Sequence, residues 1–388
     1  MRIVDIREST AKLQSSMRNA VIDFSRMTTS VVAIITDVIR DGKPVVGYGC
    51  GSNGRYAQGG ILRERLIPRL REAEPESLLD ASGNLDPVRI QACMMQNEKP
   101  GGHGDRAVAA AVIDMAVWDA VAKIEEKPLW RVLSERYNNG DHDDRVLVYP
   151  GGGYYYPGKE IEQLQSEMRA YREQGYRIVK MKIGGAPLDT DIRRIESVLE
   201  IVGSGDNLAV DANGRFDLET AIAFGNAAAP YKLCWFEEPG DPLDFALNAE
   251  LVKHYARPIA TGENLFSVQD VKNLALYGGM RTDRDWIQAD PALGYGLTEY
   301  LKMLDALEPL GWSRRRHIPH GGHLLGLHMA AGLQLGGTES YPLVFQPYGG
   351  FTDDAVIENG LTAPPTGPGL GIEQKSALIE ALRPIAEG

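Results

Sequence analysis

Residues 207–264 begin with NLAVDANG, continue through LCWFEEP at residues 233–239 and end with PIATGEN at residues 258–264. Each of these motifs is a short apolar run that ends in an acidic residue, and an amphipathic stretch of helical length separates it from the next. Regular alternation of strand and helix predicts βαβ units and therefore a parallel sheet.

The same alternation continues on both sides of this region. Two β-rich runs precede it, RVLVYP at residues 145–150 and RIVKMKIG at residues 177–184, and three follow it, WIQADPA, RRRHIPHG and TESYPLVF. Roughly eight such strands fit a (β/α)₈ barrel, which usually takes about 250 residues. A doubly wound sheet fits less well, because no G-x-G-x-x-G motif follows the first strand.

Polar side chains end six consecutive predicted strands at intervals of 26 to 30 residues, and they are Lys182, Asp211, Glu237, Glu263, Asp290 and His320. One βα unit takes roughly 31 residues when about 250 residues are shared among eight units. Active sites of barrel enzymes lie at the carboxyl-terminal ends of the strands. We therefore expect these six side chains to meet at that end of the barrel.

The first third of the chain has an α+β pattern. Strands are predicted in RIVDIRES, SVVAIITDV and VVGYGCGS, and the DGKP turn at residues 41–44 joins the last two into an antiparallel hairpin. Residues 61–96 are expected to be helical. A longer helix is expected over residues 105–126, with Asp105 as its N-cap and Pro128 just beyond its end.

These patterns divide the chain into three parts. Residues 1–140 are expected to form an α+β domain and residues 141–350 a barrel. Residues 351–388 include the Gly- and Pro-rich stretch TAPPTGPGLGIE and are expected to pack back on the first domain.

The composition limits the classes of partner. A net charge of −12 argues against a nucleic acid partner, because phosphate backbones select basic surfaces. The amino terminus MRIVDIREST lacks the apolar core of a signal peptide, and no stretch approaches 18 consecutive apolar residues, so no membrane partner is expected. Cys50, Cys93 and Cys234 form no C-x-x-C pair, which favours the cytoplasm. We expect a small-molecule ligand and a homo-oligomer.

Three acids on adjacent strands indicate a metal site. Asp211, Glu237 and Glu263 would repel one another strongly at low dielectric. A hard divalent cation removes this conflict, and an all-oxygen ligand set suits Mg²⁺. Salt bridges to neighbouring strands are the alternative interpretation, but few basic residues share the spacing.

Two lysines are candidates for the base. Lys180 and Lys182 form K-x-K, so their side chains point to the same face of one strand. Two neighbouring ammonium groups disfavour each other's protonation, so we expect a lowered pKa, in the range that a general base needs.

The histidine-rich stretch HIPHGGHLLGLH at residues 317–328 offers an acid. Its spacing supports no zinc site, because it lacks H-E-x-x-H and a cysteine partner. Only His320 follows the strand-end interval, and Asp290 could hold its ring N–H. His317 and His323 are expected in packing or supporting roles, and His328 in a structural one.

Together these motifs resemble the enolase superfamily, in its mandelate racemase-like branch. The matching pieces are K-M-K at residues 180–182, V-D-A-N at 210–213, W-F-E-E-P at 235–239, T-G-E-N at 261–264, Asp290 with His320, and P-G-L-G-I at 368–372. The helix DMAVWDAVAKIEEKPLW is similar to a helix of the family's capping domain.

The resemblance implies an α/β fold, a modified TIM barrel (β/α)₇β with an N-terminal α+β capping domain that the C-terminal tail completes. It implies Mg²⁺ held by Asp211, Glu237 and Glu263, with Lys182 and the His320–Asp290 pair facing the substrate from opposite sides.

Within the branch, H-I-P-H-G-G-H is most similar to D-tartrate dehydratases. The expected reaction removes the proton next to a carboxylate and eliminates the β-hydroxyl, converting D-tartrate to oxaloacetate and water. Another acid-sugar dehydratase, or a racemase or epimerase of the same superfamily, would use the same groups.

Further residues are candidates for binding a dicarboxylate or acid-sugar substrate. Lys180 and Asn213 accompany the strand-end residues, and Glu339 could hydrogen-bond a substrate carboxylate through a proton. Candidates from loops are Asn19, Asn53, Arg55, Lys99 and Tyr154 to Tyr156.

Two other classes of protein remain to be distinguished. A Schiff-base lyase would use Lys182 as a nucleophile. A non-catalytic barrel would have no need of K-x-K opposite an Asp–His pair, and Lys182→Ala or His320→Asn would not change its function.

Overall fold

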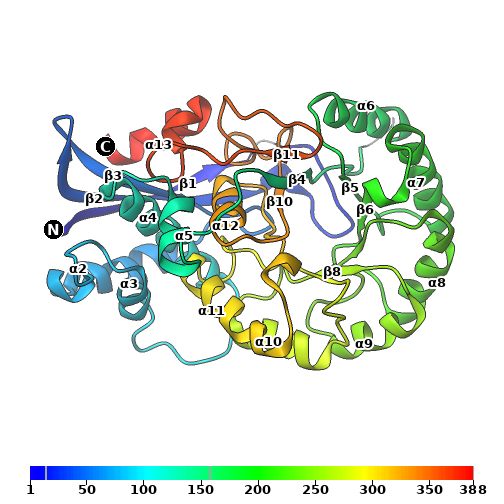
Figure 1. Cartoon of the computed structure of the whole chain (residues 1–388), viewed down its shortest axis with the longest axis horizontal. Helices are drawn as coiled ribbons and strands as arrows, with labels where there is room; N and C mark the ends of the chain where they lie inside the picture. The colour runs from blue at the N-terminus through cyan, green and yellow to red at the C-terminus, as the bar shows by residue number, and fades with distance from the viewer. Residues whose placement is uncertain (14, 157, 159, 388) are drawn as a thin grey trace.

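The computed structural model describes residues 1–13, 15–156, 158 and 160–387. The sheet near the N-terminus lies at one end of the molecule together with the C-terminal helix, and a ring of strands and helices forms the other end (Figure 1).

The strands form two groups. An antiparallel sheet near the N-terminus contains β1 (Ile3–Lys12), β2 (Thr28–Arg40) and β3 (Lys43–Cys50). The remaining strands are β4 (Val146–Pro150), β5 (Val179–Lys182), β6 (Leu208–Asp211), β7 (Phe236–Glu237), β8 (Ile259–Thr261), β9 (Trp286–Ile287), β10 (Thr338–Ser340) and β11 (Leu361–Thr362).

The helices before the barrel are α1 (Gly59–Ile61), α2 (Ile67–Glu72), α3 (Pro87–Met94), α4 (Asp105–Ile124) and α5 (Leu129–Tyr137). Those that follow are α6 (Glu160–Glu173), α7 (Leu188–Val202), α8 (Leu218–Ala228), α9 (Phe245–His254), α10 (Val268–Tyr277), α11 (Leu297–Leu307), α12 (Leu324–Gly332) and α13 (Ser376–Glu387).

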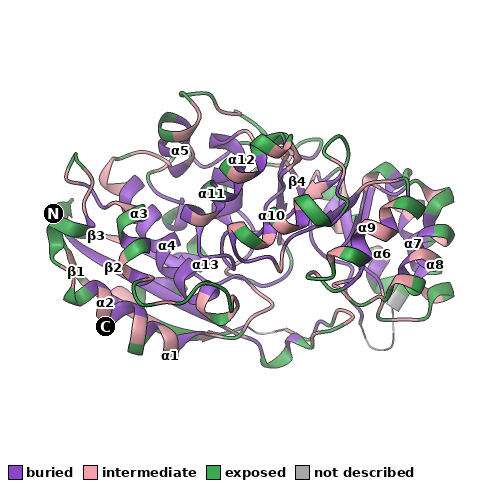
Figure 2. Cartoon of the chain, turned by 90° about the horizontal axis from the view of Figure 1, so that it is seen from below, coloured by how far each residue is buried: buried purple, intermediate pink, exposed green. Residues whose placement is uncertain are grey.

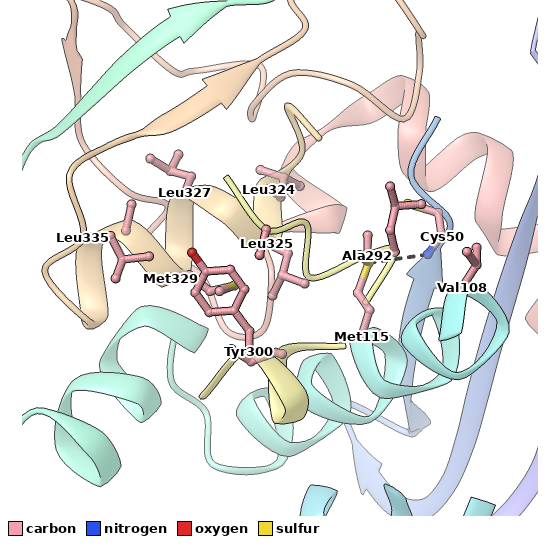
Figure 3. Packing of buried hydrophobic residues seen from close by; sticks show 14 of the residues in the cluster. Cys50, Val108, Met115, Ala292, Tyr300, Leu324, Leu325, Leu327, Met329 and Leu335 are labelled. Atoms are coloured by element: carbon pink, nitrogen blue, oxygen red, sulfur yellow. Dashed lines mark hydrogen bonds between the residues drawn. The ribbon is translucent and has the colours of Figure 1, made fainter. Parts of the chain in front are cut away.

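The long helix α4 is buried on nearly every side and packs against β3. Small residues make this possible, because a Cβ added at Gly47 would lie 2.0 Å from the carbonyl oxygen of Ala116. Figure 3 shows the contact at Cys50, whose backbone N–H donates to Sδ of Met115 over 3.5 Å. The leucines of α12 lie in the same apolar cluster, so α4 joins the N-terminal sheet to the barrel.

Parallel pairing builds the barrel. Strands β5 to β9 pair in sequence order, and β10 pairs with β4. Single β-bridges join Gly151 to Lys180 and Ile287 to His317, and the backbone N–H of Glu339 donates to the carbonyl of Pro319 over 3.3 Å to complete the ring. The segment around His317 therefore takes the place of a strand between β9 and β10, although it is too irregular to be one.

The helices α6 to α12 each follow one of these strand segments, while β10 has no helix directly after it. In Figure 2 the barrel helices turn exposed faces outward and buried faces inward. This arrangement is the modified TIM barrel (β/α)₇β, so the predicted fold class is confirmed.

Residues 61–96, which were expected to be helical, contain several short helical elements rather than continuous helix. A π-helical turn, η2 (Leu62–Leu66), follows α1, and a 3₁₀ turn, η3 (Pro75–Leu78), separates α2 from α3. Proline has no N–H and disfavours helix in the residue before it, so Pro75 and Pro87 each start a new element. The N-cap of α4 is Gly104, with a φ of 148°, and Asp105 is the first helical residue.

The C-terminal segment contacts more than the first domain. Its strand β11 pairs antiparallel with the barrel strand β4, while α13 packs against β1 and β2. The Arg7 guanidinium donates to the carbonyl of Ala386 over 2.8 Å. We propose the division at about residues 140 and 350 for the folded chain; Gly388, where the last segment ends, lies outside the described residues.

Among the helices that the structure describes, none combines the length and the apolar character needed to cross a bilayer.

Candidate active site

The strand register brings the predicted side chains together at the carboxyl-terminal mouth of the barrel. Lys182 is paired with Asp211 across β5 and β6, and Asp211 with Glu237 across β6 and β7. Glu263 follows β8 and Asp290 follows β9 by a few residues. His320 comes just after the bridge at His317, so six consecutive barrel segments contribute one group each.

Asp211, Glu237 and Glu263 form a candidate metal centre. One oxygen from each carboxylate lies within 4.8 Å of the others. Burial raises the pKa of Glu237 to about 7, and the neighbouring charge of Asp211 adds to this effect against the opposing influence of Lys180. Buried acids that resist ionising together suit a divalent cation, and oxygen-only ligands suit Mg²⁺. The residues present therefore fit this cofactor.

Both lysines contact these acids. Lys182 Nζ lies 2.5 Å from Asp211 Oδ2, and Lys180 Nζ lies 2.5 Å from Glu237 Oε1 and 2.7 Å from Glu339 Oε1. Two of the three acids, Asp211 and Glu237, thus form the salt bridges that are the alternative interpretation to a metal site. Lys180 supplies them from below the cavity, where it is fully buried.

The expectation of a lowered lysine pKa is wrong for this structure. Burial by itself lowers the pKa of Lys182, but attraction to Asp211 outweighs it, and the pKa lies above its ordinary value. Lys180 behaves in the same way because of Glu237 and Glu339. The carboxylates beside the two ammonium groups therefore outweigh the repulsion between the ammonium groups. A carboxylate that also holds a cation attracts a lysine less strongly.

The imidazole of His320 is held by Asp290. Its Nδ1 lies 2.8 Å from Asp290 Oδ2. Burial lowers the pKa of His320, but the charges of Glu263 and Glu339 and the hydrogen bond that the imidazole donates to Asp290 raise it to about 10. His320 is therefore protonated at neutral pH and can serve as an acid.

Asp290 is itself held by several donors. It accepts hydrogen bonds from the Ala292 N–H (2.7 Å) and from Ser52 Oγ (2.7 Å). Nε2 of His323 lies 3.4 Å away. Burial raises the pKa of Asp290, but the bonds from His320 and His323 hold it below its ordinary range. Ser52 belongs to the loop after β3, so the N-terminal domain reaches the Asp–His pair.

A cavity of about 210 Å³ lies between the lysine and the histidine. Of the predicted residues, those that line it are Asn19, Asn53, Arg55, Tyr154, Lys182, Asn213, Glu263 and His320. The other predicted groups from the barrel do not line the cavity and are buried, and they are Lys180, Asp211, Glu237, Asp290 and Glu339.

The structure does not support a proton on Glu339. Burial raises its pKa, but Lys180 and His320 outweigh burial and hold the pKa below the ordinary value. Its carboxylate forms an ion pair with Lys180 and accepts a hydrogen bond from the Gly321 N–H (3.2 Å). Its predicted hydrogen bond to a substrate carboxylate, which requires a proton on Glu339, stays a prediction.

Lys99 is not brought to the cavity. Its side chain is exposed and lines a separate surface depression with His103 and Lys302. The Arg106 guanidinium holds this loop there, with a 3.0 Å ion pair to Glu98 and a 3.1 Å hydrogen bond to the carbonyl of Lys99.

The other histidines have local roles. His328 Nδ1 accepts the N–H of Trp130 over 3.0 Å, and burial lowers the pKa of His328 to about 4. Burial lowers that of His317 to about 3. His323 caps α12, since its Nδ1 accepts the N–H of Gly326.

Four residues at the site were not predicted: Ser52, Glu238, Asn264 and Tyr341. Three of them are direct neighbours of predicted residues in the motifs G-S-N, F-E-E-P and G-E-N, and Tyr341 stands two residues after Glu339. Asn264 accepts a hydrogen bond from Arg55 and donates one to Glu238 over 2.6 Å. Adjacency to a motif was the only available signal, because these contacts depend on how distant loops meet.

Comparisons with known proteins agree with this geometry. Residues 163–378 match the family described as enolase C-terminal domain-like. The L-talarate/galactarate dehydratase of Salmonella typhimurium is 30% identical over 313 residues, which cover 79% of this chain and 72% of that protein. The arabinonate dehydratase of Saccharolobus solfataricus is 30% identical over 284 residues, covering 71% and 73%.

A solved structure extends the likeness to nearly the whole chain. The L-talarate dehydratase from Polaromonas sp. JS666, complexed with Mg and L-glucarate, superposes with a TM-score of 0.75 at 27% identity, covering 98% of this chain and 97% of that one. The chain therefore belongs to the enolase superfamily, in its mandelate racemase-like branch, among whose members are acid-sugar dehydratases.

Proposed function

We propose that this chain is a Mg²⁺-dependent hydro-lyase that removes the proton next to a carboxylate and eliminates the β-hydroxyl of an acid sugar. The observation that carries the proposal is one cavity lined by both Lys182 and His320, together with Glu263 of the acidic cluster. A base and an acid on opposite sides suit an elimination in which the proton and the hydroxyl leave from different carbons.

Asp211, Glu237 and Glu263 would hold the ion. A bound Mg²⁺ would supply positive charge against the substrate carboxylate, where negative charge develops in the transition state. Asn213 supports this site, because its backbone N–H donates to Asp211 Oδ1 over 2.8 Å and orients that carboxylate.

Lys182 is the proposed base. Its Nζ takes the proton from the carbon next to the carboxylate, and the electron pair of the broken C–H bond moves into the carboxylate to give an enediolate. Lys180, fully buried beside the same acids, adds positive charge on that side. Stabilisation that grows as this charge develops lowers the barrier, whereas equal binding of substrate and transition state would not.

His320 is the proposed acid. The C–O bond to the β-hydroxyl breaks with both electrons on oxygen, and Nε2 of His320 gives that oxygen a proton, so water leaves. The remaining enol tautomerises to a keto acid. Asp290 keeps the imidazolium oriented through Nδ1.

We propose D-tartrate as the substrate, which gives one oxaloacetate and one water. The cavity of about 210 Å³ is smaller than the roughly 300–1,000 Å³ of typical drug-sized sites, which favours a short acid. The resemblance of H-I-P-H-G-G-H to D-tartrate dehydratases supports the same choice. Asn19, Asn53 and Arg55 provide uncharged and positive groups for a second carboxylate.

A longer acid sugar is the second candidate. The relatives at 30% identity act, by their names, on talarate or galactarate and on arabinonate. Racemisation would also use the same two groups, with one removing the proton and the other returning it to the opposite face.

A substrate panel tests the proposal. Purified protein with Mg²⁺ is incubated with four-, five- and six-carbon aldonic and aldaric acids, and keto-acid formation is measured. We expect D-tartrate to give the highest rate, a chelator to abolish it and Mg²⁺ to restore it. Keto acid from none of these acids, or a rate that a chelator leaves unchanged, would contradict the proposal.

Two controls distinguish the proposed hydro-lyase from a Schiff-base lyase and from a racemase. Borohydride added with the substrate would trap a Schiff base on Lys182, and we expect no trapping. Inversion of the recovered substrate without keto acid would identify a racemase.

We further propose a cytoplasmic location, since Cys50, Cys93 and Cys234 are all free thiols. Assembly into a homo-oligomer stays a prediction, which size-exclusion chromatography with light scattering would check.

A further inference from the structure

Tyr155 is buried in the loop after β4, close to the strand end that carries the proposed base. It is one of the three consecutive tyrosines that the sequence offers as candidates for substrate binding, and of these only Tyr154 lines the cavity. Substrate binding therefore does not explain the buried phenol of Tyr155.

Arg194, on α7, holds the backbone at the ends of two neighbouring strands. Its guanidinium donates through Nη1 to the carbonyl of Lys182 and through Nη2 to the carbonyl of Gly153, both over 2.9 Å. The Lys182 N–H donates to the same Gly153 carbonyl over 3.2 Å. Arg194 is 1% exposed, so these bonds are made out of water and fix the end of β5 against the loop after β4.

Asp191 and Tyr155 hold the amides that come next along the chain. Asp191 Oδ2 accepts the N–H of Gly184 over 2.7 Å, and the Tyr155 hydroxyl accepts the N–H of Gly185 over 2.9 Å. The same hydroxyl donates to Asp191 Oδ1 over 2.8 Å, and this oxygen also accepts from Arg194 Nη1 over 3.1 Å. The three side chains therefore form one connected network, called the clamp below, and they are Tyr155, Asp191 and Arg194.

The Tyr155 ring is held by packing that does not involve its hydroxyl. A Cβ added at Gly185 would lie 2.5 Å from the ring, so only glycine lets the backbone pass this close. The Arg194 guanidinium lies over the ring, 3.9 Å from its centroid, in a cation–π contact. Phenylalanine at this position would keep both contacts and lose only the two hydrogen bonds of the hydroxyl.

The backbone of Tyr155 contacts the N-terminal wall of the cavity. Its N–H donates to the carbonyl of Arg18 over 2.9 Å, in an isolated β-bridge. Asn19, the residue after Arg18, lines the cavity, and so do Ile22 and Phe24. This bond needs no side chain, so a substitution that removes only the hydroxyl leaves the wall of the cavity in place.

We propose that Tyr155 is a positioning residue for proton removal, whose hydroxyl completes the clamp that fixes the backbone of Lys182. A base takes a proton efficiently only when it is within hydrogen-bond reach and correctly aligned, so a small displacement of the strand end costs rate. This inference rests on the proposed function, in which Lys182 is the base. It gives Tyr155 no contact with the substrate.

Tyr155→Phe separates the positioning of the base from the binding of substrate and metal. We expect kcat for keto-acid formation to fall about tenfold, the effect of losing a hydrogen bond to a charged group. KM and the affinity for Mg²⁺, measured by calorimetry, should not change, because the cavity wall and the acids are kept. Expressing kcat per Mg²⁺-binding site prevents a loss of folded protein from lowering it.

Tyr176→Phe is the matched control. Tyr176 is also buried, and its hydroxyl bonds to Ser340 Oγ over 2.8 Å, but it neither lines the cavity nor contacts the clamp. We expect this variant to keep the kcat of the unmodified enzyme. An unchanged kcat in Tyr155→Phe, a rise in KM alone, or an equal fall of kcat in both variants would overturn the inference.

Amide hydrogen exchange without substrate keeps this inference separate from the proposed function. The N–H groups of Lys182 and Ile183 bond to backbone carbonyls, so they keep their acceptors in Tyr155→Phe. We expect both to exchange about tenfold faster in this variant, because the segment opens more easily without the clamp, and to stay unchanged in Tyr176→Phe. Unchanged exchange in Tyr155→Phe would overturn its role whatever the substrate is, whereas faster exchange with a failed substrate panel would remove only the proposed reaction.

Discussion

At the scale of single residues, the site depends on opposite charges held at short distances out of water. Lys182 pairs with Asp211, and His320 pairs with Asp290 and Glu263. Lys182 and His320 both contact carboxylates of the acidic cluster, and this attraction holds the pKa of each above its ordinary value.

Replacing the proposed base should separate catalysis from metal binding. Lys182→Ala should lower keto-acid formation by about 10³-fold or more, within the range that a general base contributes. Its affinity for Mg²⁺, measured by calorimetry, should be retained because the three acids remain. Turnover near that of the unmodified enzyme would remove Lys182 as the base.

The hydroxyl of Ser52 should also matter, although it belongs to the N-terminal domain. It donates to Asp290 over 2.7 Å and helps to orient the carboxylate that holds His320. Ser52→Ala should lower kcat about tenfold, which corresponds to about 1.4 kcal/mol, with little change in KM. Ser197→Ala is the matched control, since Ser197 bonds to the Arg194 carbonyl on α7, away from the cavity. Equal kcat values for the two variants would argue against this contact.

At the scale of elements, the sequence predicted those parts of the site that strand register determines. Lys182, Asp211 and Glu237 end neighbouring parallel strands, and equal spacing along the chain becomes adjacency in space. The sequence could not predict that Ser52 and Tyr341 lie at the site, or that Lys99 lies away from it. Such loop contacts depend on how separate elements pack. Residues 61–96 are helical in part, and prolines divide the helical pattern into short elements.

Two buried neutral histidines, His328 and His317, should make the stability of the fold fall at acidic pH. The pKa of His328, held at about 4 by burial, lies below its ordinary value of 6.5. Between these values the unfolded chain binds more protons, so stability is present above pH 6.5 and is lost as the pH falls toward 4, by up to about 1.4 kcal/mol per pH unit. Burial also lowers the pKa of His317, so His317 likewise reduces stability as the pH falls.

A substitution measures this contribution. His328→Gln keeps an acceptor for the Trp130 N–H but has no group that titrates in this range. The drop in melting temperature between about pH 7 and pH 5 should be smaller in this variant than in the unmodified protein. His254→Gln, at a largely exposed position on α9, is the control that should keep the original drop. Equal drops in all three proteins would show that His328 is not buried in its neutral form.

At the scale of the whole molecule, two parts of the chain complete one site. The barrel supplies the acids, the lysines and His320, while the loop after β3 and the segment around Asn19 close the cavity from the N-terminal side. The C-terminal segment contacts both parts, through β11 on β4 and α13 on β1 and β2. The proposed catalytic groups therefore come from the barrel, and the segments that close the cavity come from the N-terminal part. The proposed reaction depends on the acids at the mouth of the barrel.

Calorimetric titration of Mg²⁺ into the purified protein and into Glu237→Gln tests the central claim most directly. Glu237 is buried within the acidic cluster, and its amide replacement keeps the shape but removes the charge. We expect the unmodified protein to bind one Mg²⁺ per chain and the variant to bind it at least about tenfold more weakly. Equal affinities, or no binding to the unmodified protein, would contradict the assignment of Asp211, Glu237 and Glu263 as the metal site.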